Sequence, residues 1–310
     1  KQNIAVYILT FFLSMVGIGE DIIIAPFGIS LVASCISRGI PLVMVYLSSL
    51  VGTTVKFGIN GLLIYIVCSL LVLLSVMVTK PKRKLDEANE RIKIGGRLAF
   101  SVFLVQFLYM LFTNFYFYDS LTSIMISITS YIFYKIFVNS ISVINEYGIK
   151  RVFSIEEVIG ASLLIAIAVS ALGNLSVFTY SIKNIVCIFI VLYLGFRNGI
   201  LVGATGGITI GIVLSLVGGG EAILIATYAI SGMVAGLLNK FGKIGVVVGF
   251  ILGNIASTYA SSGGAENIIL FQEILIAAIG LLFVPKKTKI NIKDIVPDIK
   301  LLPEAGKNLE

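Results

Sequence analysis

The sequence predicts an all-α, polytopic integral membrane protein, a helical bundle with about ten to twelve transmembrane helices. Of its 310 residues, 58% are hydrophobic and only 13% are charged, and the mean hydropathy is +1.05. Soluble domains carry about 25% charged residues, so we expect lipid to cover most of this surface. In addition, the apolar residues fall into runs that are separated by short polar turns.

A membrane-spanning helix needs about 20 apolar residues, and several runs reach that length comfortably. These are residues 57–79, 98–118, 120–138, 158–180 and 268–284. The further runs are 4–19, 200–217, 222–238 and 244–260. The runs at 22–37, 40–55 and 184–196 are short. They fit half-spans, re-entrant pieces or helices buried inside the bundle.

The positions of the basic residues predict how the helices are oriented. If the N-terminus is cytoplasmic, only Lys56 and Lys183 of the 23 Lys and Arg fall in outside turns. The inside turns then lie near Arg38, 80–97, 139–157, Arg197, 239–243 and the C-terminal tail. Cytoplasmic loops carry such an excess of positive charge. The distribution therefore predicts that both termini lie inside and that the number of spans is even.

The runs divide the chain into a first transmembrane group (1–79), a helical hairpin (98–138) and a glycine-rich transmembrane group (158–284). Between them we expect a basic cytoplasmic loop (80–97) and a second cytoplasmic loop (139–157). A juxtamembrane tail (285–310) leads to a domain that this chain does not contain, since we expect the chain to be part of a longer one.

The two loops carry signals of their own. Residues 80–97 hold seven basic and three acidic residues, which fits either contact with anionic lipid or a role in orientation alone. In FSIEE, Ser154 is a predicted N-cap with Glu157 at N3, a capping box that would start the next helix at 158.

Glycine recurs every fourth residue in the last transmembrane group and forms three strips. Residues four apart lie on one helix face, and small residues let membrane helices approach closely. The strips therefore predict helix packing inside the bundle or a face for self-association. Their members are Gly199, Gly203, Gly207 and Gly211; Gly245, Gly249 and Gly253; and Gly232 with Gly236.

One further stretch, VGGGEA at 217–222, leaves a ligand site open. A helix broken by its glycines would place Glu221 near the membrane, where ionisable side chains are rare and often functional. The same stretch also fits an ordinary outside turn. Glu221 is therefore kept as a possible intramembrane polar site.

The sequence predicts no catalytic, cofactor or metal site in this chain. It has no His, which excludes Ser-His-Asp and Cys-His catalysis and HExxH zinc sites. It has no GK[ST] phosphate loop, and its five Asp do not cluster. The three Cys lie in apolar runs and are expected to be buried thiols. We expect no nucleic-acid partner, because in such a chain the net charge of +7 reflects topology.

Several stretches together resemble one family. They are APFGISLVAS (25–34), YLGFRNGILVGATGGITIGIVLSL, TYAISGMVAGLLNKFGKIGVVVGFILGN, a last helix ending in FVPKK, and the tail KLLPEAGKNLE. They are similar to the membrane region of stage II sporulation protein E. The resemblance covers essentially the whole chain and is strongest over 190–290.

That resemblance implies about ten membrane helices that anchor a cytoplasmic regulatory segment and a manganese-dependent, PP2C-type serine/threonine phosphatase. It implies that the phosphatase acts on an anti-anti-sigma factor, activates a forespore sigma factor and collects at the polar septum of a bacterial cell membrane. The metal-binding aspartates of that phosphatase have no counterpart here, since the dipeptide DG does not occur.

We therefore expect a membrane anchor, localisation and assembly region, with the lipid bilayer, further copies of itself and septal division or sporulation proteins as partners. Two alternatives stay open. The glycine clusters and Glu221 also suit a small-molecule transporter component. The glycine-rich composition of the membrane segments also suits a ligand-sensing multi-helix membrane domain.

Overall fold

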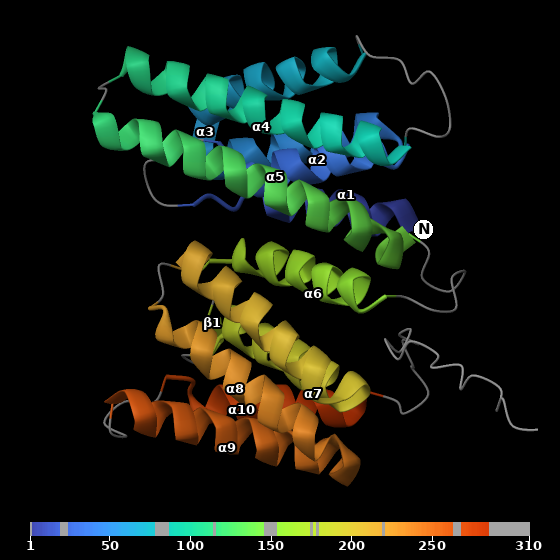
Figure 1. The fold of residues 1–310 in the computed structure, drawn as a ribbon, viewed down its shortest axis with the longest axis vertical. Helices are drawn as coiled ribbons and strands as arrows, with labels where there is room; N and C mark the ends of the chain where they lie inside the picture. The colour runs from blue at the N-terminus through green and yellow to red at the C-terminus, as the bar shows by residue number, and fades with distance from the viewer. Residues whose placement is uncertain are drawn as a thin grey trace, which may run out of the picture.

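A computed structural model describes most of the chain, and its helices run side by side across the molecule (Figure 1). The first five helices form one half and the last five form the other. The described residues are 2–18, 24–77, 87–113, 116–145, 154–173, 176–177, 180–218, 221–262 and 268–284. Almost all of them are helical, consistent with the predicted all-α membrane bundle.

The N-terminal half contains α1 (Gln2–Ser14), α2 (Pro26–Ser37), α3 (Leu42–Met77), α4 (Glu87–Phe112) and α5 (Phe117–Asn145). The C-terminal half contains α6 (Ile155–Ser170), α7 (Ile182–Gly218), α8 (Ile223–Leu237), α9 (Gly242–Ser262) and α10 (Phe271–Phe283). The 3-10 turn η2 (Leu238–Phe241) joins α8 to α9. Two short strands, β1 (Ser176–Val177) and β2 (Tyr180–Ser181), pair antiparallel before α7.

Among the described residues, five helices are long and apolar enough to cross a membrane. They are Leu42–Val76, Asn89–Phe112, Phe117–Ile144, Ile182–Val217 and Ile223–Ser261. Three further apolar helices are shorter: Ile4–Ser14, Pro26–Ser37 and Phe271–Phe283. Helix α2 is buried along most of its length, as expected for a short helix inside a bundle.

Helix α3 folds back on itself at a glycine. Gly58 has φ 67° and ψ −163°, a combination that only glycine adopts without strain. The Tyr46 hydroxyl lies 2.9 Å from Ser69 Oγ, although 23 residues would separate the two by about 35 Å along a straight helix. Thus α3 is a hairpin with two arms, which match the separate apolar runs at 40–55 and 57–79.

The same turn occurs twice in the C-terminal half. Gly199 in α7 has φ 76° and ψ −157°, and Gly242 at the start of α9 has φ 77° and ψ −159°. A methyl group on Gly203 would lie 3.2 Å from the Gly195 Cα, so the two arms of α7 run antiparallel in contact. These arms match the runs at 184–196 and 200–217.

Several helix ends differ from the sequence expectation. Helix α4 begins at Glu87 and so includes residues 87–97, which hydropathy alone assigned to a loop. The capping box is present: Ser154 Oγ accepts from the Glu157 N–H, and a Glu157 carboxylate oxygen accepts from the Ser154 N–H. The helix begins at Ile155 rather than at 158, because the residues of the first turn after the N-cap are already helical.

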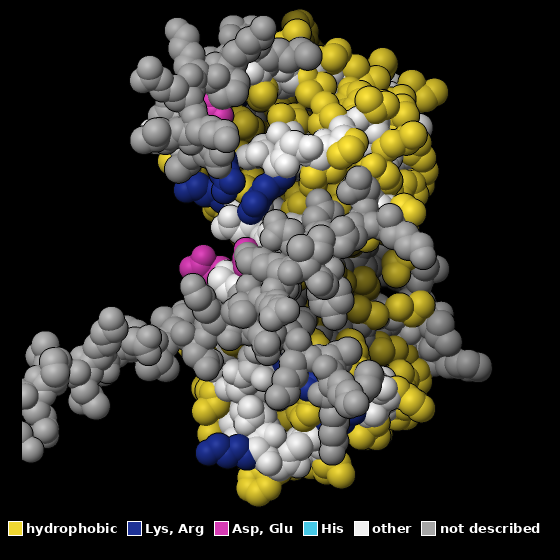
Figure 2. Space-filling model, turned by 90° about the vertical axis from the view of Figure 1, so that its right-hand side faces the viewer, with side chains coloured by type: hydrophobic (Ala, Val, Ile, Leu, Met, Phe, Trp, Pro, Cys, Tyr) yellow, Lys and Arg dark blue, Asp and Glu magenta, His cyan; other side chains and the backbone are white. Residues whose placement is uncertain are grey.

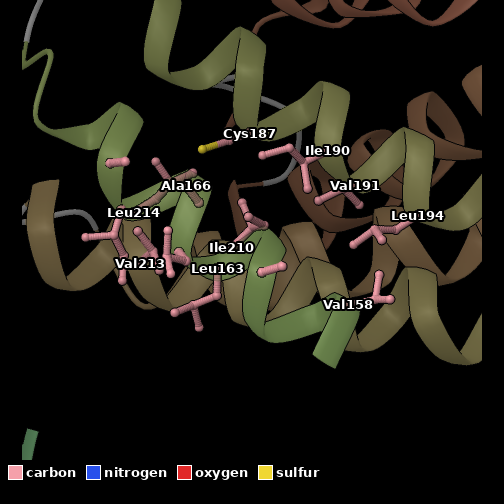
Figure 3. Packing of buried hydrophobic residues seen from close by; sticks show 14 of the residues in the cluster. Val158, Leu163, Ala166, Cys187, Ile190, Val191, Leu194, Ile210, Val213 and Leu214 are labelled. Atoms are coloured by element: carbon pink, nitrogen blue, oxygen red, sulfur yellow. The ribbon is translucent and has the colours of Figure 1, made fainter. Parts of the chain in front are cut away.

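The core runs through both halves, and α6 lies where they meet. Figure 3 shows Val158 and Ala166 of α6 beside Leu194 and Cys187 of α7. Cys35, Cys68 and Cys187 are all buried free thiols, as the sequence predicts.

The sides of the bundle expose large apolar side chains. Ile59, Phe100 and Ile244 are 72%, 65% and 72% exposed. Monomeric soluble proteins rarely expose such extended apolar surface, whereas lipid-facing helices require it. The structure therefore fits the hydropathy of the sequence.

Candidate functional site: a glycine-packed helix, a buried carboxylate and a basic end

The first glycine strip lies against α8 of the same chain. A methyl group on Gly203 would overlap the Gly232 carbonyl oxygen, and one on Gly207 would overlap that of Tyr228. One on Gly211 would lie 2.6 Å from the Ile225 Cα. The backbones of α7 and α8 are thus in direct contact, which only residues without a side chain allow.

The second strip packs on another side of α8. Methyl groups on Gly249 and Gly253 would lie 2.6 Å from the Val234 carbonyl oxygen and 2.5 Å from the Ser231 Cα. Near the turn, a methyl group on Gly245 would meet the Phe241 Cβ at 2.5 Å. Helix α8 is therefore held between α7 and α9 by backbone contacts.

The remaining predicted glycines complete these contacts. Gly232 and Gly236 belong to α8 and approach the carbonyl oxygens of Gly203 and Gly199. Gly199 itself forms the turn of α7, with the Asn239 amide nearby. Gly199 and Gly245 thus meet residues of the turn η2, and the other glycines of the strips face a neighbouring helix of the same chain. Self-association through the strips stays a prediction.

Glu221 lies exposed immediately before α8. The buried carboxylate of the C-terminal half belongs instead to Glu273, which is 2% exposed in the first turn of α10. Its Oε1 accepts from the Ser181 N–H at 3.1 Å, and its Oε2 accepts from Asn184 Nδ2 at 3.1 Å. Glu273 therefore ties α10 to β2 and to the start of α7.

A cavity of about 180 Å³ adjoins this carboxylate. Its wall also holds Lys183 and Tyr228, and the described residues that line it are Lys183, Asn184, Leu214, Leu224, Tyr228, Ile268, Ile269 and Glu273. Nearby, Asn254 Nδ2 donates to the Ile269 carbonyl at 2.9 Å. Pockets for drug-sized ligands measure about 300–1,000 Å³, so this one suits only waters or a small polar molecule.

Sequence reasoning missed Glu273, although a signal existed. The run 268–284 is apolar apart from this carboxylate and its Gln neighbour. A charged residue inside a spanning run is a candidate site by default. The prediction favoured Glu221 because it follows a glycine triplet, a weaker signal than an acidic side chain within the run itself.

The described Lys and Arg gather at one end of the bundle. Arg38 Nε donates to the Val138 carbonyl, so the end of α2 lies beside α5. Ser142 Oγ donates to Glu157, which joins the end of α5 to the start of α6. Figure 2 looks onto this end and shows the Lys and Arg side chains there, most of them on the N-terminal half.

Of the ten described Lys and Arg, eight lie toward this end and two, Lys56 and Lys183, toward the other. The eight are Arg38, Arg91, Lys93, Arg97, Lys135, Arg197, Lys240 and Lys243, placed by the contacts between the helix ends and turns that carry them. Such asymmetry is typical of a membrane protein with a cytoplasmic basic side. Within the described part of the chain, no group of three or more His, Cys, Asp or Glu could hold a metal ion.

A family model described as SpoIIE, N-terminal domain, matches residues 1–293. The chain belongs to this family. It is similar to stage II sporulation protein E of Bacillus subtilis (strain 168), with 28% identity over 180 residues. That match covers 58% of this chain and 22% of the relative, so the chain spans a minor part of the relative's length. No solved structure matches this SpoIIE N-terminal domain significantly.

Proposed function

We propose that this chain is the membrane anchor, localisation and assembly region of a sporulation serine/threonine phosphatase. The match of a SpoIIE N-terminal domain over residues 1–293 carries the proposal. The apolar sides of the bundle and its basic end support it. The catalytic domain, its manganese, and its action on an anti-anti-sigma factor that leads to forespore sigma-factor activation would belong to the rest of the longer protein.

The proposed topology places the basic end in the cytoplasm of a bacterial cell. The described helical segments then alternate in direction: α3 crosses to the outside and back through its turn at Gly58, and α7 crosses to the cytoplasmic side and back out through its turn at Gly199. This gives the ten to twelve membrane segments that the sequence predicts. Both termini lie on the cytoplasmic side, where a following phosphatase would meet its substrate.

Cysteine labelling in whole cells tests this topology. In a variant whose native Cys are replaced by Ala, Lys56→Cys should react with a membrane-impermeant maleimide in intact cells. Lys240→Cys should react only after permeabilisation. Both positions lie two residues before the glycine of the same kind of turn but at opposite ends of the bundle, so equal labelling of the two in intact cells would refute the layout.

Localisation in sporulating cells tests the function. A fluorescent protein fused after Glu310 should collect at the polar septum, with partners among the septal division or sporulation proteins. A full-length protein lacking residues 1–293 should lose septal localisation and forespore-specific transcription. Uniform fluorescence of the fused region over the cell membrane would contradict the anchoring and localisation role.

A second function, ligand sensing, is favoured by the cavity at Glu273. Its lining combines an ammonium, an amide, a phenol and a carboxylate, which suits a small polar molecule. A sensing domain should keep its septal localisation when Glu273 is replaced by Gln but lose control of the attached phosphatase. A transporter component would instead show altered uptake of its substrate in the same variant.

A further inference from the structure

We propose that the basic end of the N-terminal half holds a binding site for the phosphate headgroup of an anionic phospholipid, formed by Arg38, Arg91 and Lys135. These side chains come from α2, α4 and α5, which meet at this end. The site rests on the proposed membrane insertion but not on the septal role or on the identity of the attached domain.

Two adjoining cavities form the site, and Arg91 lies in the wall of both. One cavity, of about 280 Å³, is lined by Arg91, Ile92, Tyr134, Lys135, Val138 and Asn139. The other, of about 380 Å³, is lined by Ser37, Arg38, Glu90, Arg91 and Ile94. Either volume exceeds that of the cavity at Glu273 and accommodates a phosphate group.

Hydrogen bonds fix the backbone around these cavities. Tyr134 Oη donates to the Arg91 carbonyl at 3.0 Å, which ties α5 to the first turns of α4. Arg38 Nε donates to the Val138 carbonyl at 2.7 Å, which ties the end of α2 to the same part of α5. Because Val138 lines the first cavity, this contact brings the Arg38 guanidinium to its edge. The fold therefore holds close together the parts of α2, α4 and α5 that carry the three cations.

The charge balance favours an anion. Among the described residues that line the two cavities, there are three cations, Arg38, Arg91 and Lys135, and one carboxylate, that of Glu90. Lys135 is exposed, with its ammonium 5.2 Å from the centre of the Tyr131 ring. Arginine forks and a lysine ammonium are the side chains that bind phosphate oxygens best.

The apolar surroundings favour a lipid over a free phosphate. Ile132, less than one turn before Lys135 on α5, is exposed, and so is Phe100 further along α4. A phospholipid bound by its headgroup would lay its acyl chains along these side chains. Basic pockets between membrane helices on the cytoplasmic side are suited to anionic headgroups. At this site the cations lie toward the end of the bundle, and exposed apolar side chains follow further along the same helices.

Native mass spectrometry of the full chain tests the proposal. The protein is reconstituted with phosphatidylcholine alone or with added phosphatidylglycerol or cardiolipin, and the retained lipids are counted. We expect the unaltered chain to retain the anionic lipids preferentially. Arg91→Gln and Lys135→Gln should each lower that retention about fivefold, as expected for removal of one basic residue close to an anionic surface.

The matched control is Lys240→Gln, which removes one positive charge at the same end of the bundle but in the other half. It should leave retention unchanged, while thermal unfolding in detergent shows that all three variants fold. Equal loss in Lys240→Gln and Lys135→Gln would overturn the site, because general charge would then suffice.

Competition separates the two sources of phosphate. Inorganic phosphate and glycerol phosphate should fail to displace the bound lipid at millimolar concentration, because they lack acyl chains. If either displaces it as well as a short-chain phosphatidylglycerol does, the lipid proposal is wrong. Loss of septal localisation in cells would leave these results untouched, so failure of the proposed function is distinguishable.

Discussion

The two halves of the molecule are built on the same turn but differ in how many glycine contacts join their helices: Gly28 and Gly52 bring α2 and α3 against α1 in the N-terminal half, whereas whole strips do so in the C-terminal half. In the N-terminal half, hydroxyl and guanidinium groups bond to neighbouring helices, as in Ser30 Oγ to the Ser130 carbonyl at 2.9 Å. In the C-terminal half, bare backbones of α7 and α9 touch α8 through glycine. Lipid offers no hydrophobic force between helices, so either polar bonds or close dispersion contact must hold them.

The turn itself is common to both halves. Gly58, Gly199 and Gly242 share nearly the same dihedral angles, and each follows a basic residue two positions earlier: Lys56, Arg197 and Lys240. The difference between the halves therefore lies in the helix faces rather than in the connections. Substitutions in the faces should separate the halves, whereas substitutions in the turns should not.

The largest effect is expected from a side chain introduced into the glycine contact. Gly207→Leu would drive its Cβ into the backbone of Tyr228, which cannot move without displacing α8. We expect a loss of about 3 kcal/mol or more, at the upper end of overpacking costs, measured as unfolding in detergent. The control is Gly96→Leu in α4, because nothing lies within 4 Å of a Cβ there; a similar loss at both positions would refute the comparison.

The turns should respond equally in the two halves. Gly58→Ala and Gly242→Ala add a methyl group to open space, so only backbone strain at positive φ remains. Each substitution should lower the free energy of unfolding by about 1–3 kcal/mol, and the two losses should be equal. Gly96→Ala should instead stabilise α4 slightly, because alanine is the better helix former. A loss in one turn alone would show that the turns are not equivalent.

The buried carboxylate gives a third test within the C-terminal half. Glu273→Leu would leave the Ser181 N–H and the Asn184 amide without their acceptor. Buried donors left unpaired cost about 1–3 kcal/mol, and the loosened start of α7 should show faster amide hydrogen exchange at Ser181. The matched Glu221→Leu substitution, at an exposed carboxylate, should change stability by less than about 0.5 kcal/mol. Equal losses of stability in the two variants would show that the hydrogen bonds of Glu273 do not stabilise the fold.

Much of this fold could be predicted from hydropathy because lipid imposes simple rules. Each apolar run of the sequence corresponds to a helix or to one arm of a hairpin, and eight of the ten described Lys and Arg lie at one end, as the positive-inside rule predicts. The ends of the helices were harder to predict from the sequence. Residues 87–97 are charged yet helical, because membrane helices continue past the apolar region where charge alone suggests a loop.

The site was less accessible to sequence reasoning for a physical reason. A periodic strip such as Gly203 and Gly207 indicates a helix face without side chains, but it does not indicate which helix packs against that face. The contacts in the structure identify that partner as α8, the next helix along the chain. The three cations of the lipid site are 53 and 44 residues apart in sequence, and no local pattern joins them.

The smallest predicted effect concerns the side-chain bonds of the N-terminal half. Tyr46→Phe removes the bond of the Tyr46 hydroxyl to Ser69 Oγ, which links the two arms of α3. Side-chain hydrogen bonds between membrane helices contribute on average about 0.6 kcal/mol, so unfolding in detergent should shift only slightly. In a double-mutant cycle with Ser69→Ala, the coupling should equal this value. A coupling of several kcal/mol would mean that single polar bonds hold this half as firmly as the glycine contacts hold the other, and the contrast between the halves would fail.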